Sequence, residues 1–184
     1  MDSFLENEYV VYIYEGLAYL ASAFILFFIG KIIYQLFNSK INVKNELVEK
    51  DNFAFSLAHT GYFVGLLLAI GSAIVGPSSG LENDLVDIAV YGGLAIILLN
   101  ISAIINDKVI LRKFSIHKEI IEYQNAGTGI IEAANFIATG LIIFGAVSGD
   151  SGELQDGLIT ATAFWAIGQV AMVLTSFVYN LSLI

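Results

Sequence analysis

The sequence predicts an all-α protein, a polytopic membrane bundle of five transmembrane helices. Hydrophobic residues make up 57% of the 184-residue chain and charged residues only 14%, which leaves too little polar surface for a soluble domain of this size. Apolar runs long enough to cross the roughly 30 Å hydrocarbon core of a bilayer occur five times. The eight basic residues gather in or beside two of the connections between these runs, and the other connections carry acids.

The five predicted spans are separated by short polar segments. They are Val10–Phe37, Phe53–Val75, Leu85–Ile105, Ala126–Val147 and Leu158–Ile184. Strands are a poor alternative, because the runs lack period-two alternation and an open sheet would leave backbone groups unpaired in lipid. No Pro-, Gly- or Ser-rich linker divides the chain, so residues 1–184 are predicted to form a single membrane domain.

The basic residues predict the orientation of the spans. Each lies in the connections 38–52 and 106–125 or at an adjoining helix end, namely Lys31, Lys40, Lys44, Lys50, Lys108, Arg112, Lys113 and Lys118. Because positively charged loops stay in the cytoplasm, the N-terminus is predicted to lie outside and the C-terminus inside (N-out/C-in). The acidic N-terminus lacks the basic region of a signal peptide, so we expect the first helix to be retained.

An internal repeat is also predicted. When the chain is shifted by 73 residues, segment 45–106 (repeat one) aligns without a gap on segment 118–179 (repeat two), and helix 10–37 is extra. Identical pairs include Glu46 with Glu119, Glu49 with Glu122, Asn52 with Asn125, and Phe63 with Phe136. Each repeat comprises an acidic lead-in, a span, a short acidic loop and a span back. Because each contains two spans, the repeats are predicted to be parallel, related by an axis near the membrane normal.

The lead-ins carry a resemblance to a known family. The motif E-L-V-E-x-D-N at Glu46–Asn52, its partial copy E-I-I-E-x-x-N at Glu119–Asn125 and the tandem two-helix layout are similar to the domain-of-unknown-function 350 family of bacterial inner-membrane proteins, across residues 10–184. The resemblance implies a multi-pass protein of the bacterial plasma (inner) membrane, in a family whose members often occur beside envelope-stress or phage-shock-like genes. It supplies neither a substrate nor catalytic residues.

Each lead-in places polar residues immediately before an apolar helix. Asp51 and Asn52, and likewise Gln124 and Asn125, stand where side-chain oxygens cap free backbone N–H groups and where acids favour the positive end of the helix dipole. We expect this capping role. The alternative is that the glutamates of the two lead-ins form a docking surface for a cytoplasmic partner.

The sharpest candidates for chemistry are His59 and Glu132, which occupy equivalent positions in the two repeats. Each lies about seven residues into its span, roughly 10 Å along the helix, where an ionisable side chain is costly and commonly faces the bundle interior. If the repeat axis passes between the second and fourth spans, His59 and Glu132 approach each other across it. Two interpretations stay open: a buried polar pair that holds helices together, and a path for protons or cations.

Other polar residues within the spans have ordinary explanations. Glu15 and Asp87 lie near the outer ends of their spans, where an interfacial carboxylate needs no function. The amides Asn100, Asn135 and Gln169 are predicted to form hydrogen bonds across helices rather than to bind a substrate.

Small residues at four-residue spacing on the second span predict close helix packing. They are Gly61, Gly65, Ala69 and Ala73, and the equivalent positions in the fourth span are Ala134, Ala138, Ile142 and Ala146. We expect this stripe to pack within the bundle, and self-association in the membrane is the alternative.

The residue types in the chain argue against several classes of function. The chain has no cysteine, two histidines and no H-E-x-x-H, G-x-S-x-G or P-loop motif, so we expect no enzyme, no catalytic residues and no cofactor. His59 with Glu132 offers two ligands without a third, so no metal site is predicted. Eight basic residues against seventeen acids make no sustained basic field, which excludes nucleic acid as a partner.

Two functions stay open. The sequence favours a structural or partner-binding role in envelope homeostasis, as the resemblance implies, with the lipid bilayer and either a homo-oligomer or another membrane or cytoplasmic protein as partners. The alternative is a small proton or cation channel or transporter that uses His59 and Glu132. The first is favoured because no span contains a proline break of the kind that interrupts transporter helices at their binding sites.

Overall fold

The computed structural model describes residues 8–76, 78–110, 115–149 and 154–182. Within these residues the chain forms no strand and five long helices, α2 (Glu8–Phe37), α3 (Phe53–Val75), α4 (Leu81–Ile105), α5 (Ala126–Val147) and α6 (Leu154–Ser182). Each of the five is long and apolar enough to cross a bilayer. The predicted all-α class with five membrane-spanning helices is therefore confirmed.

Three helices begin earlier than predicted, and the first of them, α2, begins at Glu8 rather than Val10. α4 begins at Leu81 rather than Leu85, and α6 begins at Leu154 rather than Leu158. The added turns contain the acids Glu82, Asp84 and Asp156. Negative charge in the first turn favours a helix because it faces the positive end of the helix dipole, whereas hydropathy alone placed these residues in the loops.

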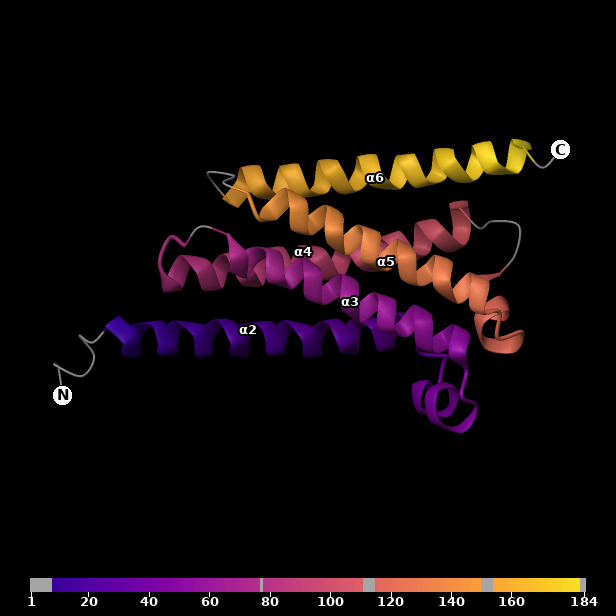
Figure 1. Cartoon of the computed structure of the whole chain (residues 1–184), viewed down its shortest axis with the longest axis horizontal. Helices are drawn as coiled ribbons and strands as arrows, with labels where there is room; N and C mark the ends of the chain where they lie inside the picture. The colour runs from indigo at the N-terminus through magenta and orange to yellow at the C-terminus, as the bar shows by residue number, and fades with distance from the viewer. Residues whose placement is uncertain (1–7, 77, 111–114, 150–153, 183–184) are drawn as a thin grey trace.

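Three short π-helical segments lie at one end of the bundle (Figure 1). They are η1 (Asn45–Glu49) before α3, η2 (Asn106–Ile110) continuing α4, and η3 (Lys118–Glu122) before α5. A π turn is wider than an α turn, so it changes which side chains face inward, and such turns are frequent at functional sites. This end carries the connections 38–52 and 106–125 and is called the basic end below; the opposite end is called the acidic end.

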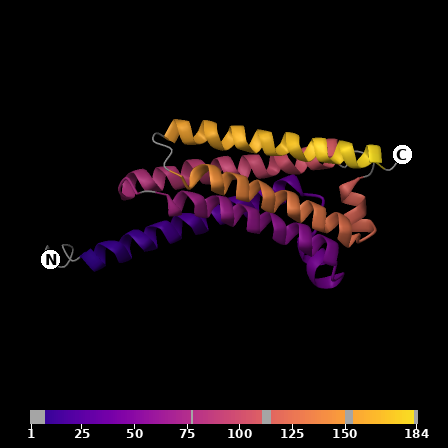
Figure 2. The same cartoon turned by 45° about the horizontal axis from the view of Figure 1, so that its top comes forward.

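The helices α3 and α5 form the centre of the bundle (Figure 1). α2 packs on one side against α4 and α3, and α6 packs on the other side against α5 and α4. A second direction of view also places α2 and α6 on opposite flanks (Figure 2). α2 begins at the acidic end and α6 ends at the basic end, so the chain crosses the bundle five times.

Glycines bring α3 and α5 into backbone contact. A Cβ atom at Gly65 would lie 2.3 Å from the carbonyl oxygen of Phe136, and one at Gly140 would lie 2.3 Å from the carbonyl oxygen of Gly65. A Cβ atom at Gly61 would lie 2.4 Å from the Cα atom of Ala133. Nonbonded carbon and oxygen atoms do not approach so closely, so a larger residue at these positions requires the helices to separate. The small residues of α3 therefore pack within the bundle, as predicted.

On α5 the contact uses different residues from those that the repeat placed there. The side of α5 that meets α3 carries Gly129, Ala133 and Gly140, whereas Ala134 is exposed. Neighbouring residues on a helix differ in direction by about 100°, so α3 and α5 present faces to each other that are not equivalent under the 73-residue shift. The expected small-residue stripe was therefore wrong for α5.

The first helix is attached by close contacts with α3 and α4. A Cβ atom at Gly30 of α2 would lie 2.4 Å from a methyl carbon of Leu66 in α3, and one at Gly92 of α4 would lie 2.5 Å from a methyl carbon of Leu26 in α2. The hydroxyl of Tyr62 donates a hydrogen bond of 3.2 Å to the carbonyl oxygen of Gly30. These contacts fix the rotation of α2 about its own axis.

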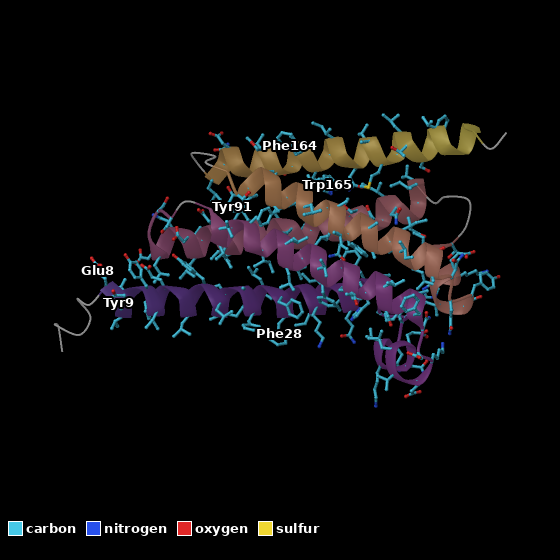
Figure 3. The ribbon with its side chains drawn as sticks, viewed as in Figure 1. Glu8, Tyr9, Phe28, Tyr91, Phe164 and Trp165 are labelled. Carbon is cyan, nitrogen blue, oxygen red and sulfur yellow. The ribbon has the colours of Figure 1, made fainter. Side chains whose placement is uncertain are left out.

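The outward faces of α2 and α6 are uncovered. Phe28 of α2 is 56% exposed and Phe164 of α6 is 55% exposed (Figure 3). Trp165, next to Phe164, lies instead on the side of α6 that faces the other helices (Figure 3). Apolar surface of this extent is stable against lipid rather than against water. The protein therefore contacts the lipid bilayer along both flanks.

Candidate functional site

The two lead-ins have the same local backbone. In both, a π turn is followed by a non-glycine residue in the left-handed region, Asp51 at φ 50° and Gln124 at φ 49°, and then by the asparagine that begins the next helix. The side-chain oxygens of Asn52 and Asn125 each accept a hydrogen bond of 3.0 Å from a backbone N–H of the first helical turn. Capping is thus confirmed for the asparagines, whereas Asp51 and Gln124 supply the turn. The internal repeat as a whole stays a prediction.

A lead-in glutamate holds each capping asparagine. The amide of Asn52 donates to the Glu46 carboxylate at 2.9 Å, and that of Asn125 donates to the Glu119 carboxylate at 2.9 Å. In lead-in one (Glu46–Asn52) both bonded residues are buried, with Asn52 0% and Glu46 4% exposed, and Asn52 also donates to the carbonyl oxygen of Ile120 at 2.9 Å. That second bond ties lead-in one to η3, whereas Asn125 in lead-in two is exposed.

Lead-in one contains the ion pair of Glu46 with Lys50, at 2.6 Å. Burial by itself would raise the pKa of the Glu46 carboxyl group, but hydrogen bonds from Lys50 and Asn52 and the charge of Lys50 outweigh it and hold this pKa below its usual value. The Glu46 carboxylate is therefore engaged within the lead-in, which favours the structural over the docking interpretation at this position.

Glu132 of α5 is held by Asn106, the residue at which α4 passes into the π turn η2. Asn106, the first residue of η2, is 1% exposed and donates a hydrogen bond to the Glu132 carboxylate across the bundle. Glu132 itself is 7% exposed. Among the described residues Glu132 forms no ion pair. Burying an ionised carboxylate without an ion pair is costly.

A cavity of about 240 Å³ lies beside Glu132 and is called the basic-end cavity below. It is bounded by α2, α3, α4 with η2, α5 and the connections at the basic end. Its ionisable lining residues are Tyr34, Asp107, Lys108, His117 and Glu132. Most of its other lining residues are aliphatic or aromatic, so the cavity combines one buried acid with a mainly apolar surface.

His59 and Glu132 do not form the predicted pair. The ring centroid of His59 lies 5.2 Å from that of Tyr34, 5.4 Å from that of Phe55 and 4.9 Å from that of Phe63. The Nδ1 atom of His59 is buried and has no hydrogen-bond partner in the described part of the chain. The cause is the rotation of α3, which turns Gly61 toward α5 and therefore turns His59, two residues earlier, toward α2.

Two of the predicted amides meet a serine of α4. Asn135 donates to the carbonyl oxygen of Ser102 at 3.2 Å, while Gln169 and Trp165 donate to the Ser102 hydroxyl oxygen at 2.9 and 2.8 Å. The hydroxyl of Thr139 lies 3.1 Å from that of Ser102. This Ser102 cluster joins α4, α5 and α6, and the amides form hydrogen bonds across helices as expected. Asn100 does the same, donating to the Tyr62 hydroxyl at 3.2 Å.

Sequence reasoning missed Ser102, Asn106 and Trp165. Ser102 of α4 and Asn106 at the start of η2 are four residues apart and both are buried, with Asn106 bonded to Glu132 and Ser102 to side chains of α5 and α6. The available signal was this spacing, because polar residues four apart in an apolar span lie on one helix face.

At the acidic end, Asp84 rather than Glu15 or Asp87 is the acid with several partners. The hydroxyls of Tyr19 and Ser78 each donate to the Asp84 carboxylate at 2.6 Å. Asp87 lines a neighbouring cavity of about 200 Å³, and Glu15 is half-buried on α2. The bonds of Asp84 connect α2 to the start of α4, which is a structural role.

A cluster of buried apolar residues lies between α3, α4, α5 and α6. The residues packed there include Ala69, Leu98, Ile143 and Ala161, all buried. No group of three or more histidine, aspartate or glutamate side chains that could hold a metal ion occurs among the described residues.

One relative is a UPF0719 transmembrane protein of Aquifex aeolicus (strain VF5), to which the chain is 28% identical over 125 residues. The matched part is 68% of this chain and 44% of that protein, so the chain spans less than half the length of this relative. No solved structure matches the chain. The relative's name and the five apolar helices agree that the chain is an integral membrane protein.

The family model of the Domain of Unknown Function DUF350 matches residues 7–147. The match covers more than half of the chain, including both lead-ins, Asn106 and Glu132, and it ends before α6. This integral membrane protein therefore belongs to the DUF350 family.

Proposed function

We propose that this membrane protein takes up a proton or a small cation at Glu132 from the basic end of the bundle. The observation that carries the proposal is the position of the Glu132 carboxyl group, which is buried, borders the basic-end cavity and is bonded to the neutral amide of Asn106. A proton or a cation arriving through the cavity would neutralise this carboxylate, whereas no described basic side chain pairs with it.

The proposal includes an orientation in the bacterial inner membrane. Every basic residue of the chain belongs to the basic end or to a helix end beside it, so this end would face the cytoplasm, with the N-terminus outside and the C-terminus inside. The cation or proton taken up at Glu132 would then come from the cytoplasm.

The apolar packing between the helices favours a site that opens on one side at a time over an open pore. Ala69, Leu98 and Ile143 belong to a buried apolar cluster between the helices, which an ion crossing the bundle there would have to displace. Transport would therefore require a second arrangement in which the helices separate at the acidic end, as in alternating access. Glu132 would be the binding residue, and His59 would have no part in the path.

The test is flux into liposomes that contain the purified full chain, with proton, Na⁺ and K⁺ uptake measured between pH 5 and 8. We expect uptake above that of empty liposomes, and we expect Glu132→Gln to abolish it. The matched control is Glu122→Gln, which changes an exposed glutamate at the same end of the bundle. Equal uptake by the wild type and Glu132→Gln would contradict the proposal.

A structural or partner-binding role in envelope homeostasis is the second candidate, favoured by the uncovered aromatic faces of α2 and α6. Because the chain lacks cysteine, single substitutions give specific cross-linking sites. Phe28→Cys and Phe164→Cys, each oxidised in native membranes, report on the two flanks separately. A cross-linked dimer or a cross-linked partner protein would support this role, and monomers in both cases would count against it.

A further inference from the structure

We propose that the ligand of the basic-end cavity is a small organic ammonium ion, paired with Glu132 and surrounded by the aromatic rings of Tyr34, Phe55 and Phe136. The inference rests on the proposed function, because it assigns a chemical class to the cation taken up at Glu132. It goes further in excluding a bare alkali metal ion as the preferred ligand.

Aromatic rings reach the cavity from three different helices. Tyr34 comes from α2, Phe55 from α3 and Phe136 from α5, and all three line the cavity together with Glu132. The face of an aromatic ring attracts organic cations, and several rings around one cavity form the aromatic cage that binds alkylated ammonium groups. Rings from three helices, with a carboxylate among them, supply both features of such a site.

The rings are held in place before any ligand arrives. The ring centroid of Tyr62 lies 4.5 Å from that of Tyr34 and 5.3 Å from that of Phe136, so Tyr62 packs between two of the cage rings. Tyr62 in turn is fixed by its hydrogen bonds with Gly30 and Asn100. A pre-organised site loses little side-chain entropy on binding, which favours affinity.

The cavity also offers hydrogen-bond acceptors for an ammonium group. Glu132 presents its carboxylate, and Asn100 uses its NH₂ group toward Tyr62 and the Ile96 carbonyl, which leaves the amide oxygen as an acceptor. The Tyr34 hydroxyl makes no hydrogen bond to other described residues and is a further acceptor. A primary ammonium has three N–H donors, and this set matches them in number.

The remaining lining disfavours a bare metal ion. Hard cations require a shell of several oxygen ligands, whereas apart from Tyr34, Glu132, Asp107 and two asparagines the lining is mainly aliphatic and aromatic, as at Ala58, Ile104 and Ile120. These side chains instead suit the carbon atoms of an organic cation, which gain by leaving water. The volume of about 240 Å³ is below the roughly 300–1,000 Å³ of sites for drug-sized ligands, so the ligand has few carbon atoms.

Calorimetric titration of the detergent-purified full chain with n-butylammonium chloride tests the inference, with NaCl and KCl titrated at the same ionic strength. We expect one saturable site for n-butylammonium and at least about tenfold weaker binding of Na⁺ and K⁺. Glu132→Gln should abolish the binding, and the control Glu122→Gln should leave it unchanged. Equal binding by the metal ions, or binding that survives Glu132→Gln, would overturn the inference.

A matched pair of variants distinguishes the contribution of the Tyr34 ring to binding from that of its hydroxyl group. Tyr34→Leu removes the aromatic face at similar volume and should weaken n-butylammonium binding roughly tenfold, whereas Tyr34→Phe keeps the face and should weaken it by only about threefold. Equal weakening by the two variants would overturn the cage. If Glu132→Gln stops ion flux in liposomes but n-butylammonium does not bind the wild type, the proposed function stands and this inference fails.

Discussion

The two lead-ins share a backbone but not an environment. In lead-in one, Asn52 and Glu46 are buried, and Asn52 reaches across to the Ile120 carbonyl oxygen. In lead-in two, the equivalent bond between Asn125 and Glu119 has the same length but lies at an exposed asparagine. Local sequence therefore sets the turn, and tertiary packing sets how much stability each turn contributes.

The same lesson applies to His59 and Glu132, which are also 73 residues apart. His59 packs among aromatic rings beside α2, while Glu132 borders the basic-end cavity and is bonded to Asn106. Equivalent sequence positions have therefore acquired different surroundings, because α3 and α5 turn different faces toward each other. Matched substitutions at equivalent positions are the direct way to test this asymmetry.

The largest difference is expected between Asn52→Ala and Asn125→Ala. Asn52→Ala removes a helix cap together with the donor to one Glu46 oxygen and to the Ile120 carbonyl, so we expect a loss of about 2–3 kcal/mol in unfolding free energy. Asn125→Ala removes an exposed cap and should cost about 1 kcal/mol or less. Denaturation in mixed detergent micelles, followed by circular dichroism, measures both. Equal losses would show that burial does not distinguish the lead-ins.

The ionisation of Glu46 should make the stability depend on pH. The pKa of Glu46 is lowered in the folded chain, so its ionisation contributes stability above the unfolded value of about 4.3 that is lost as the pH falls through the folded pKa. Glu46→Gln should cost about 1–2 kcal/mol at pH 7 and flatten the decline in stability below pH 4.5. Glu119→Gln should leave the decline in place. A decline of unchanged steepness in Glu46→Gln would contradict the assignment.

Much of the fold could be predicted because hydropathy reports directly on helices that cross lipid. The runs that end at Phe37, Val75 and Val147 end there in the structure as well. The acidic first turns of α4 and α6 were predicted to be loops. A hydropathy scale scores a charged residue such as Asp84 as unfavourable for a span, although an acid stabilises the start of a helix.

The candidate site was only partly predictable. Glu132 stood out because an acid inside an apolar span is costly. Its partner Asn106 was missed because hydropathy ended the span at Ile105 and placed Asn106 in the connection. Predicting whether His59 meets Glu132 required knowledge of how each helix is rotated about its own axis. The position of Gly61 indicates this rotation for α3, but the repeat predicted the wrong rotation for α5.

A smaller effect is expected for His59→Phe. The buried Nδ1 atom of His59 lacks a hydrogen-bond partner, and phenylalanine would fill the same aromatic surroundings without an unpaired polar atom. We expect the unfolding free energy to rise by about 1 kcal/mol, with ion uptake in liposomes unchanged. Lost uptake in His59→Phe would restore His59 to the ion path and remove the functional asymmetry with Glu132.

The smallest effect concerns the left-handed residues, Asp51 and Gln124, whose φ values of 50° and 49° are nearly equal. Glutamine in this region pays roughly 1–2 kcal/mol of strain, while glycine replaces the strain with a smaller entropic cost, so Gln124→Gly should stabilise the chain by about 0.5 kcal/mol. Aspartate tolerates the region better, so Asp51→Gly should change stability by about zero. The same micelle denaturation resolves the difference when both variants are compared with the wild type. A larger gain at Asp51 would mean that packing around lead-in one, rather than side-chain type, determines the strain in these turns.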